Sequence, residues 1–338
     1  MAALPDSYLD AHRYDGAALV HDRRERIVPC AIQPRDFQLV RDVWRYKFLT
    51  APQLHELFWP GDSAWPVQRR LRKLFRAGLL ERFRPLARRG SYPWTYQLGE
   101  QGHRMLRDSG VVPVGTRYKP RRLYDFGRVL HELQLNAWVL ALRRHAGPAF
   151  LAWDGEQLIE PERPTRSERD DPIRRVHGDW SAEGMRDERE RPVCPDAVIE
   201  LARSDDERYR TFLIEFDRTH RVDKNFDKFR RYDSFLCWWW QRLPQALDQE
   251  PPFVVFVCQD ESQRQLFMGA ADHELTGHHW HPGAGAERND YVGRRRILFA
   301  LERDAHAGNA EVWRLPEFPS DHPCRDRRIR RARLVDGG

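Results

Sequence analysis

Acidic residues interrupt two otherwise apolar stretches near the middle of the chain. The first reads Pro-Asp-Ala-Val-Ile-Glu-Leu over residues 195–201, and the second reads Phe-Leu-Ile-Glu-Phe-Asp-Arg over residues 212–218. A carboxylate within so apolar a run must be paired with a cation, bound to a metal or protonated, because an isolated buried charge is too costly. Asp196, Glu215 and Asp217 are therefore the first candidates for chemistry. The alternative is that one or two of them lie on an exposed sheet edge and pair with arginine.

Both stretches have the length and composition of β-strands, in which successive side chains point to opposite faces. This places Glu215 and Asp217 on the same face of the second strand. Carboxylate oxygens gathered on adjacent strands are the hard ligands that Mg²⁺ or Mn²⁺ prefers. We therefore predict that Asp196, Glu215 and Asp217 bind a divalent metal ion on a strand–turn–strand hairpin. Such an ion would activate a water molecule for hydrolysis.

A helix is predicted directly after this hairpin. Lys224, Lys228 and Tyr232 recur every four residues along it, and residues one turn apart share a helix face. These side chains can therefore point together at the acids of the hairpin, where a lysine would stabilise the charge of a transition state. An ordinary solvated basic face is the alternative interpretation of the two lysines.

The composition favours a nucleic-acid partner. The chain has 338 residues, 32% of them charged, and a formal net charge of +6, which indicates about two domains with a basic excess. No apolar run approaches the roughly 20 residues of a membrane span, and the N-terminus lacks a signal-peptide pattern. We therefore expect a cytoplasmic protein without a membrane partner. The five cysteines are scattered, which argues against a disulfide framework and a zinc knuckle.

The N-terminal part of the chain has the pattern of three helices followed by two strands. The third helix is predicted over residues 63–77, and no acid lies between Ser63 and Leu80. Two strands, over residues 79–83 and 92–98, flank a basic tip at Arg88-Arg89-Gly90. This order is that of the winged helix-turn-helix, which usually places its third helix in the major groove of double-stranded DNA and its wing against the backbone.

The residues expected to contact double-stranded DNA are on that third helix and at the wing tip. The arginines and lysine would bind phosphates, with one or two possible base contacts. A winged helix that contacts protein instead of DNA is the alternative. The predicted DNA-binding residues are Gln68, Arg69, Arg70, Arg72, Lys73, Arg76, Arg88 and Arg89.

We predict an α/β (α+β) protein in which a mixed sheet flanked by helices follows the winged helix. A helix is expected over 126–145, and strands are expected over 253–258, 296–301 and 312–315. The predicted organisation is an N-terminal arm of uncertain order (1–33), a winged helix domain (34–110), a linker (111–125), a second domain (126–320) and a basic tail (321–338), of which Arg325–Arg333 is expected to be mobile.

The order helix, hairpin, helix and strand, with acids on the hairpin, resembles the restriction-endonuclease-like core of the PD-(D/E)xK nucleases. Pro195-Asp196 matches the first motif element and Glu215 the second, and Glu132 matches an extra acid that many members carry on the first core helix. The chain departs from the pattern at Asp217, where the family has lysine. Some members move this lysine to the following helix, which makes Lys224 or Lys228 its counterpart.

The winged helix, the His131-Glu-Leu-Gln-Leu-Asn segment, and Pro195-Asp196 followed by Glu215-Phe-Asp-Arg together resemble the replication-relaxation family of plasmids and integrative elements. The resemblance implies nicking of supercoiled DNA. We therefore expect a DNA-binding, metal-dependent endonuclease or nickase that acts on plasmid or other mobile-element DNA. The alternative is a catalytically inactive accessory or regulator of plasmid replication, mobilisation or defence, which the missing lysine would favour.

Two further motifs admit a functional interpretation. His279-Trp280-His281 matches the metal-binding His pair of tyrosine relaxases, but the flanking glycines and proline favour a surface loop. The three consecutive tryptophans Trp238–Trp240 cannot all face a core, so they are a possible homodimer or partner-protein surface. Partial burial at a helix end is the alternative for the tryptophans.

Overall fold

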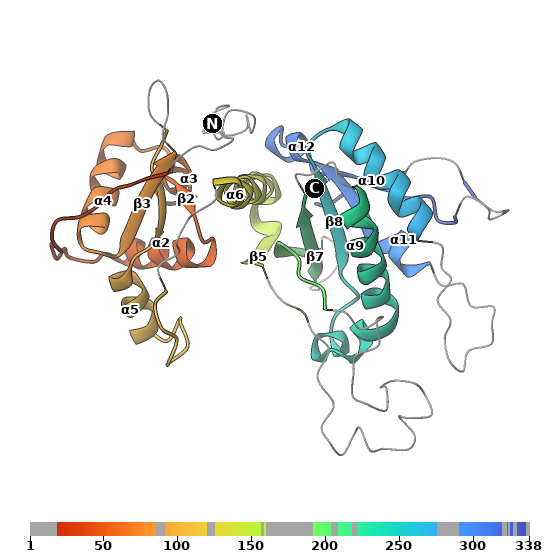
Figure 1. Cartoon of the computed structure of the whole chain (residues 1–338), viewed down its shortest axis with the longest axis horizontal. Coiled ribbons are helices and arrows are strands. Elements are labelled where there is room, and N and C mark those ends of the chain that lie inside the picture. Colours follow the sequence, from red (N-terminus) through yellow and green to blue (C-terminus); the bar gives the residue numbers. More distant parts are fainter. Residues whose placement is uncertain are drawn as a thin grey trace, which may run out of the picture. The chain divides into compact units, whose positions relative to one another are not determined.

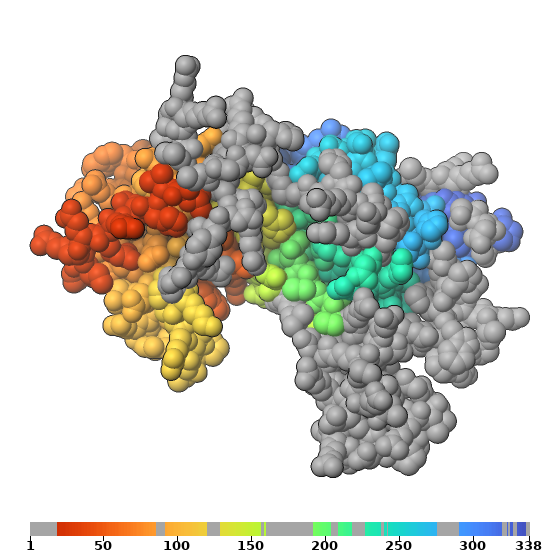
Figure 2. Space-filling model, in the orientation of Figure 1, coloured from red at the N-terminus to blue at the C-terminus, as the bar shows by residue number. Residues whose placement is uncertain are grey.

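The computed structural model describes residues 19–85, 92–119, 126–156, 159, 192–203, 209–217, 222–275, 291–319, 323, 325–326 and 330–335. Most residues outside these ranges are grey in Figure 1 and Figure 2. Within the ranges, the side chains of 126–128, 222–226, 238–239 and 242 are not described. The chain forms two compact units, Met1–Leu140 and Ala141–Gly338. The division falls within helix α6 (Phe126–Ala146), whereas the sequence predicted a linker between domains at residues 111–125.

The first unit combines helices with a four-stranded antiparallel sheet (Figure 1). The sheet has the order β1-β3-β4-β2, and the helices, strands and basic helix occur in the predicted order. β1 lies in the segment assigned to an N-terminal arm of uncertain order (1–33), and it pairs with β3 at the edge of the sheet. The elements are β1 (Leu19–His21), α2 (Pro34–Arg45), β2 (Leu49–Thr50), α3 (Ala51–Phe58), α4 (Ala64–Arg76), β3 (Leu80–Pro85), β4 (Thr95–Leu98) and α5 (Glu100–Asp108).

Local sequence signals explain where these helices begin and end. The side chain of Thr50 accepts a hydrogen bond from the backbone N–H of Gln53, while the Gln53 side chain accepts one from the backbone of Thr50. This reciprocal cap satisfies donors that the first turn of α3 leaves unpaired. Gly78 follows α4 with a φ of 76°, a conformation that side chains with a Cβ rarely adopt. The chain can therefore turn directly from α4 into β3.

The N-terminal part of α6 packs into the first unit. The Asn136 Nδ2 donates hydrogen bonds to the carbonyls of Tyr46 (2.9 Å) and Phe48 (2.6 Å). Lys47, between those two residues, has a φ of 60° and pairs with Glu132 at 2.7 Å. These contacts fix the turn between α2 and β2 against α6. Residues 126–140 are therefore part of the first unit, and the prediction that the whole helix belongs to the second domain was wrong.

The second unit contains a seven-stranded mixed sheet of order β11-β10-β9-β8-β7-β6-β5. β7, β8 and β9 are parallel neighbours, and the other pairs are antiparallel. The predicted mixed sheet flanked by helices is confirmed. The strands are β5 (Phe150–Gly155), β6 (Ala197–Ala202), β7 (Tyr209–Phe216), β8 (Phe253–Cys258), β9 (Ile297–Leu301), β10 (Glu311–Arg314) and β11 (Arg330–Arg333). Because β11 pairs with β10, the prediction of a mobile tail was wrong for residues 330–333.

Helices α9 (Val222–Ser234) and α10 (Glu261–Glu274) lie over the central strands, as Figure 1 shows. Phe229 of α9 packs against Phe256 of β8, with ring centroids 4.7 Å apart, and Phe267 of α10 joins the same cluster. The face of the sheet that carries Phe256 also carries Glu215, because these residues are neighbours in the register of β7 and β8. The apolar packing of α9 therefore sets the distance between this helix and Glu215.

Shorter elements complete the second unit. They are the helices α11 (Val292–Arg296) and α12 (Glu302–His306), the 3-10 turns η2 (Gly147–Ala149), η5 (Trp240–Arg242) and η6 (Pro244–Leu247), and the π-helical turn η4 (Phe235–Trp239). Trp240 is buried and packs against Phe235, whereas the side chains of Trp238 and Trp239 are outside the described residues. None of the described helices has the length and apolar character needed to cross a membrane.

Candidate active site and nucleic-acid interface

Asp196 and Glu215 lie opposite each other at the end of the β6–β7 hairpin. The register pairs Ala197 with Ile214, and one step further along it brings Asp196 beside Glu215. Backbone hydrogen bonds on both sides of Glu215 hold Asp196 in place. The Asp196 N–H donates to the Ile214 carbonyl at 2.8 Å, and the Phe216 N–H donates to Asp196 Oδ2, also at 2.8 Å. The strand pairing itself therefore positions one of the two carboxylates.

The Glu215 side chain is buried, with 2% of its surface exposed, and is held by two residues of α9. Lys228 Nζ donates to Glu215 Oε2, and the Tyr232 hydroxyl donates to Oε1, each at 2.5 Å. The structure thus brings Lys228 and Tyr232 together at the hairpin acid, as their four-residue spacing predicted. The side chain of Lys224 lies outside the described residues.

Asp217 and Cys194 lie at the edge of this cluster. The Asp217 carbonyl accepts a hydrogen bond from Gln263 Nε2 at 3.1 Å, and its negative charge contributes to raising the pKa of Lys228. Cys194 was not predicted as a site residue. Burial, Glu156, Glu215 and Asp196 all raise the pKa of its thiol. Cys194 is two residues before Asp196, and residues two apart in an extended segment point to the same side. This spacing is the signal that could have identified it.

Burial dominates the electrostatics of the site. It raises the pKa of Glu215 to about 7, with a further increase from Asp196 and an opposing decrease from Lys228. Burial lowers the pKa of Lys228, but its interactions with Glu215 outweigh this effect, so the net pKa is raised and the side chain stays cationic. Burial also raises the pKa of Tyr232 well above its usual value. Tyr232 therefore remains a neutral hydrogen-bond donor and is unsuited to act as a nucleophile.

The raised pKa of Glu215 predicts that protein stability falls as pH rises. The folded protein holds this proton up to about pH 7, whereas the carboxyl otherwise releases it near 4.5, so the free energy of unfolding decreases between these values. The complete decrease is on the order of 3 kcal/mol. Glu215→Gln removes this titration. In denaturant unfolding with EDTA present, the stability of the variant relative to wild type should increase over this pH range. A difference that does not change with pH would contradict the assignment.

Of the three candidate metal ligands, Asp196 and Glu215 form a pair in this structure. Among the residues that the structure describes, no group of three or more His, Cys, Asp or Glu side chains is placed to hold a metal ion. Asp196, directly before β6, and Glu215 of β7 nevertheless supply carboxylate oxygens, which are suitable donors for Mg²⁺ or Mn²⁺. His279 and His281, the alternative metal-binding residues, lie outside the described part of the chain.

The predicted DNA-binding residues of α4 separate into two groups. The side chains of Gln68, Arg69, Arg72, Lys73 and Arg76 are exposed. Arg70 instead points inward, where its Nε donates to Asp36 Oδ1 at 2.8 Å and its Nη2 donates to the Ala31 carbonyl. Asp36 is fully buried, so Arg70 compensates its charge and fixes α4 against α2. Placing Arg70 on the exposed basic face was therefore wrong. Arg88 and Arg89 are outside the described residues.

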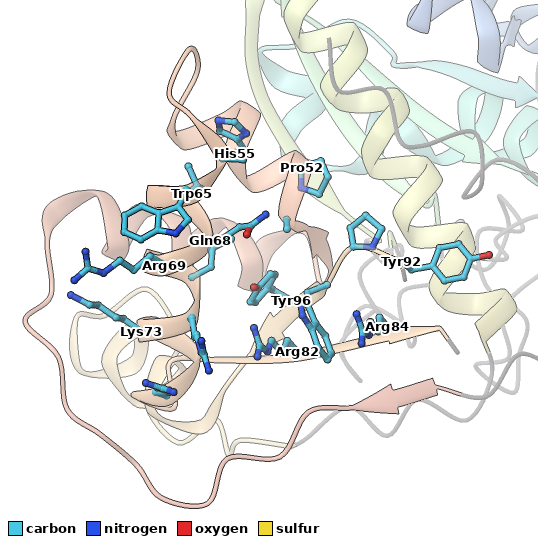
Figure 3. Close-up of a pocket in the computed structure, with 18 residues that line it drawn as sticks. Pro52, His55, Trp65, Gln68, Arg69, Lys73, Arg82, Arg84, Tyr92 and Tyr96 are labelled. Atoms are coloured by element: carbon cyan, nitrogen blue, oxygen red, sulfur yellow. The ribbon is translucent and has the colours of Figure 1, made fainter. Parts of the chain in front are cut away.

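A groove of about 1130 Å³ lies between α4 and the strands β3 and β4 (Figure 3). Its basic lining residues include Arg82 and Arg84 of β3, which the sequence analysis missed. They occupy alternate positions of a strand and therefore share a face, which is the signal that could have identified them. The other charged or aromatic lining residues are His55, Trp65, Arg69, Arg72, Lys73, Arg76, Tyr92, Trp94 and Tyr96.

Comparison with known proteins identifies the family. A model of the replication-relaxation family matches residues 40–242. The chain belongs to the replication-relaxation family. Membership suggests interaction with DNA and a role in the replication or relaxation of plasmid or other mobile-element DNA. No curated protein and no solved structure matches the chain.

The matched region of this replication-relaxation protein includes α4, Asp196, Glu215 and Lys228. It also includes the His131-Glu-Leu-Gln-Leu-Asn segment of α6. Glu132 was predicted as an extra acid of the nuclease-like site, but the structure pairs it with Lys47 in the first unit. The segment therefore has a clear structural role there. A role for Glu132 in catalysis stays a prediction.

Proposed function

We propose that this replication-relaxation protein is a DNA-binding, divalent-metal-dependent endonuclease that nicks plasmid or other mobile-element DNA. The observation that carries the proposal is the cross-strand pair of Asp196 and Glu215, with the Lys228 ammonium 2.5 Å from Glu215. Two carboxylates that can hold a metal ion, with a cation beside them, are suited to metal-dependent hydrolysis of a phosphodiester. The exposed basic face of α4 supports binding to double-stranded DNA.

Asp196 and Glu215 would hold Mg²⁺ or Mn²⁺, and Asp217 would have to move toward them to act as a third ligand, because the three acids do not form a metal-binding group among the described residues. Such an ion, when bound, lowers the pKa of a coordinated water and neutralises charge on the phosphate. Lys224 remains a further candidate for the displaced lysine, on the basis of its spacing alone.

The protein's own groups would divide the remaining work. Lys228 lies at the edge of the site, with 37% of its side chain exposed, so its ammonium can reach a phosphate while it remains beside Glu215. Charge placed in this way stabilises the additional negative charge of a phosphoryl transition state. Tyr232 donates to the other oxygen of Glu215. It would therefore fix the orientation of that carboxylate without taking part in proton transfer.

Nicking of supercoiled plasmid tests this proposal. We expect relaxation in the presence of Mg²⁺ or Mn²⁺, no relaxation with EDTA, and loss of relaxation in both Asp196→Ala and Glu215→Ala. Glu200→Gln is the matched control. Glu200 is four residues after Asp196 and points to the same side of the sheet, but its cross-strand neighbour is Thr211 and not Glu215. The control should retain wild-type nicking. Metal-dependent nicking that persists in both alanine variants would contradict the assignment.

A catalytically inactive accessory or regulatory protein is the second candidate. Asp217 at the position of the usual lysine favours it, as does the lack of a three-ligand group among the described residues. On this alternative, wild type and both alanine variants would bind plasmid DNA equally, and none would nick it at any metal concentration.

A further inference from the structure

The groove beside α4 differs chemically from a surface that binds only duplex DNA. It is concave and combines cationic side chains with aromatic rings (Figure 3). None of the residues that line it is acidic. Ligand pockets typically enclose about 300–1,000 Å³, and this groove encloses about 1130 Å³. It therefore has room for more than one nucleotide.

Trp65 is the most accessible aromatic residue of the groove. Its side chain lies at the start of α4 with 67% of its surface exposed. The guanidinium of Arg69, one turn later, lies over the indole ring at 5.4 Å from its centroid. A large apolar ring exposed to solvent beside cations is the arrangement on which an unpaired nucleobase stacks.

The opposite wall of the groove repeats this combination. Arg82 and Arg84 both approach the ring of Trp94, each at 4.4 Å from its centroid. Arg82 also pairs with Asp22, and only 14% of its side chain is exposed. Arg84 is therefore the guanidinium of this wall that can stack with a base. Among the described residues, Arg72, Lys73 and Arg76 form no ion pair, so they are available for the phosphates of a bound strand.

Duplex DNA cannot use these rings in the same way. In a duplex, each base face is covered by its stacked neighbours, and the major groove receives the convex outer surface of a helix. The concave space between α4 and the strands β3 and β4 instead suits a single strand of DNA, whose bases expose both faces. We propose that this groove binds an unpaired segment of DNA. The inference deepens the proposed function and rests on it, because a nicked or locally melted plasmid supplies such a segment.

Binding of fluorescein-labelled oligothymidylate, measured by anisotropy with EDTA present, tests the inference. We expect Trp65→Ala to weaken single-strand binding about tenfold, which is the usual scale for loss of one stacked base. Trp65→Phe, which keeps a ring, should recover most of the affinity. Binding to a labelled duplex should be unchanged in both variants. Leu247→Ala serves as the control, because Leu247 is 87% exposed and belongs to the other unit.

Several outcomes would overturn the inference. Trp65→Ala could leave single-strand affinity unchanged, or it could lower single-strand and duplex affinity equally, which would assign Trp65 to a duplex surface. Displacement of the oligonucleotide by a mononucleotide at a similar concentration would indicate a free-nucleotide site instead. Because this assay contains no metal, it is separate from nicking. A protein that binds single strands but never nicks would retain the inference and lose the proposed endonuclease activity.

Discussion

Replacing Lys228 with methionine is expected to lower the rate of plasmid nicking by about 10²–10³-fold, the effect of removing one preorganised charge from a transition state. Methionine keeps much of the length and apolar stem of the side chain but removes the ammonium that contacts Glu215 at 2.5 Å. Binding of uncleaved plasmid, measured without metal, should stay close to that of wild type. The comparison of nicking rate with binding affinity separates a role in the reaction from a role in DNA affinity.

The same substitution has a second expected signature. Lys228 lowers the pKa of Glu215, so its loss should raise that pKa further and shift the onset of nicking to higher pH. Arg230→Met is the matched control on α9, because Arg230 is exposed and pairs with Glu274 on α10. Its nicking rate should equal that of wild type. If Lys228→Met nicks at the wild-type rate and with the wild-type pH profile, Lys228 is only a structural partner of Glu215.

The parts of this site that the sequence predicted depend on local periodicity. A period of two residues placed the acids of the hairpin on their strands, and a spacing of four placed Lys228 and Tyr232 on one face of α9. Such patterns require only knowledge of the element type. In the structure both side chains contact Glu215, because Phe229, which lies between them in sequence, packs α9 onto the sheet.

The parts that were missed depend on contacts between residues distant in sequence. Arg70 occurs in an acid-free basic run, and nothing in that run shows that it pairs with Asp36, 34 residues earlier. Glu132 likewise pairs with Lys47 across 85 residues. Basic composition also suggested a mobile tail, but the edge of β10 offers unpaired backbone groups, which residues 330–333 satisfy as β11. Composition cannot reveal such pairing, because it depends on the geometry of the folded chain.

Replacing Arg72, Lys73 and Arg76 together with glutamine is expected to weaken duplex DNA binding strongly. The three side chains are exposed on α4, and glutamine preserves the helix propensity of the segment. Each lost phosphate contact reduces the slope of log affinity against log salt by about 0.9. The triple variant should therefore lose about two to three units of slope and, at low salt, about 100-fold or more in affinity. Anisotropy titrations at several salt concentrations would measure both quantities.

The control for this experiment must remove the same charge from the same unit. Arg41, Arg104 and Arg107 lie on α2 and α5, and each contacts an acid on its own helix. Their triple replacement by glutamine should change affinity and salt slope much less, because only the general charge of the unit is altered. Arg70 is unsuitable in either set, since its loss would leave the buried Asp36 uncompensated and confuse stability with DNA binding. Equal effects of the two triple variants would mean that net charge, and not the α4 surface, determines DNA affinity.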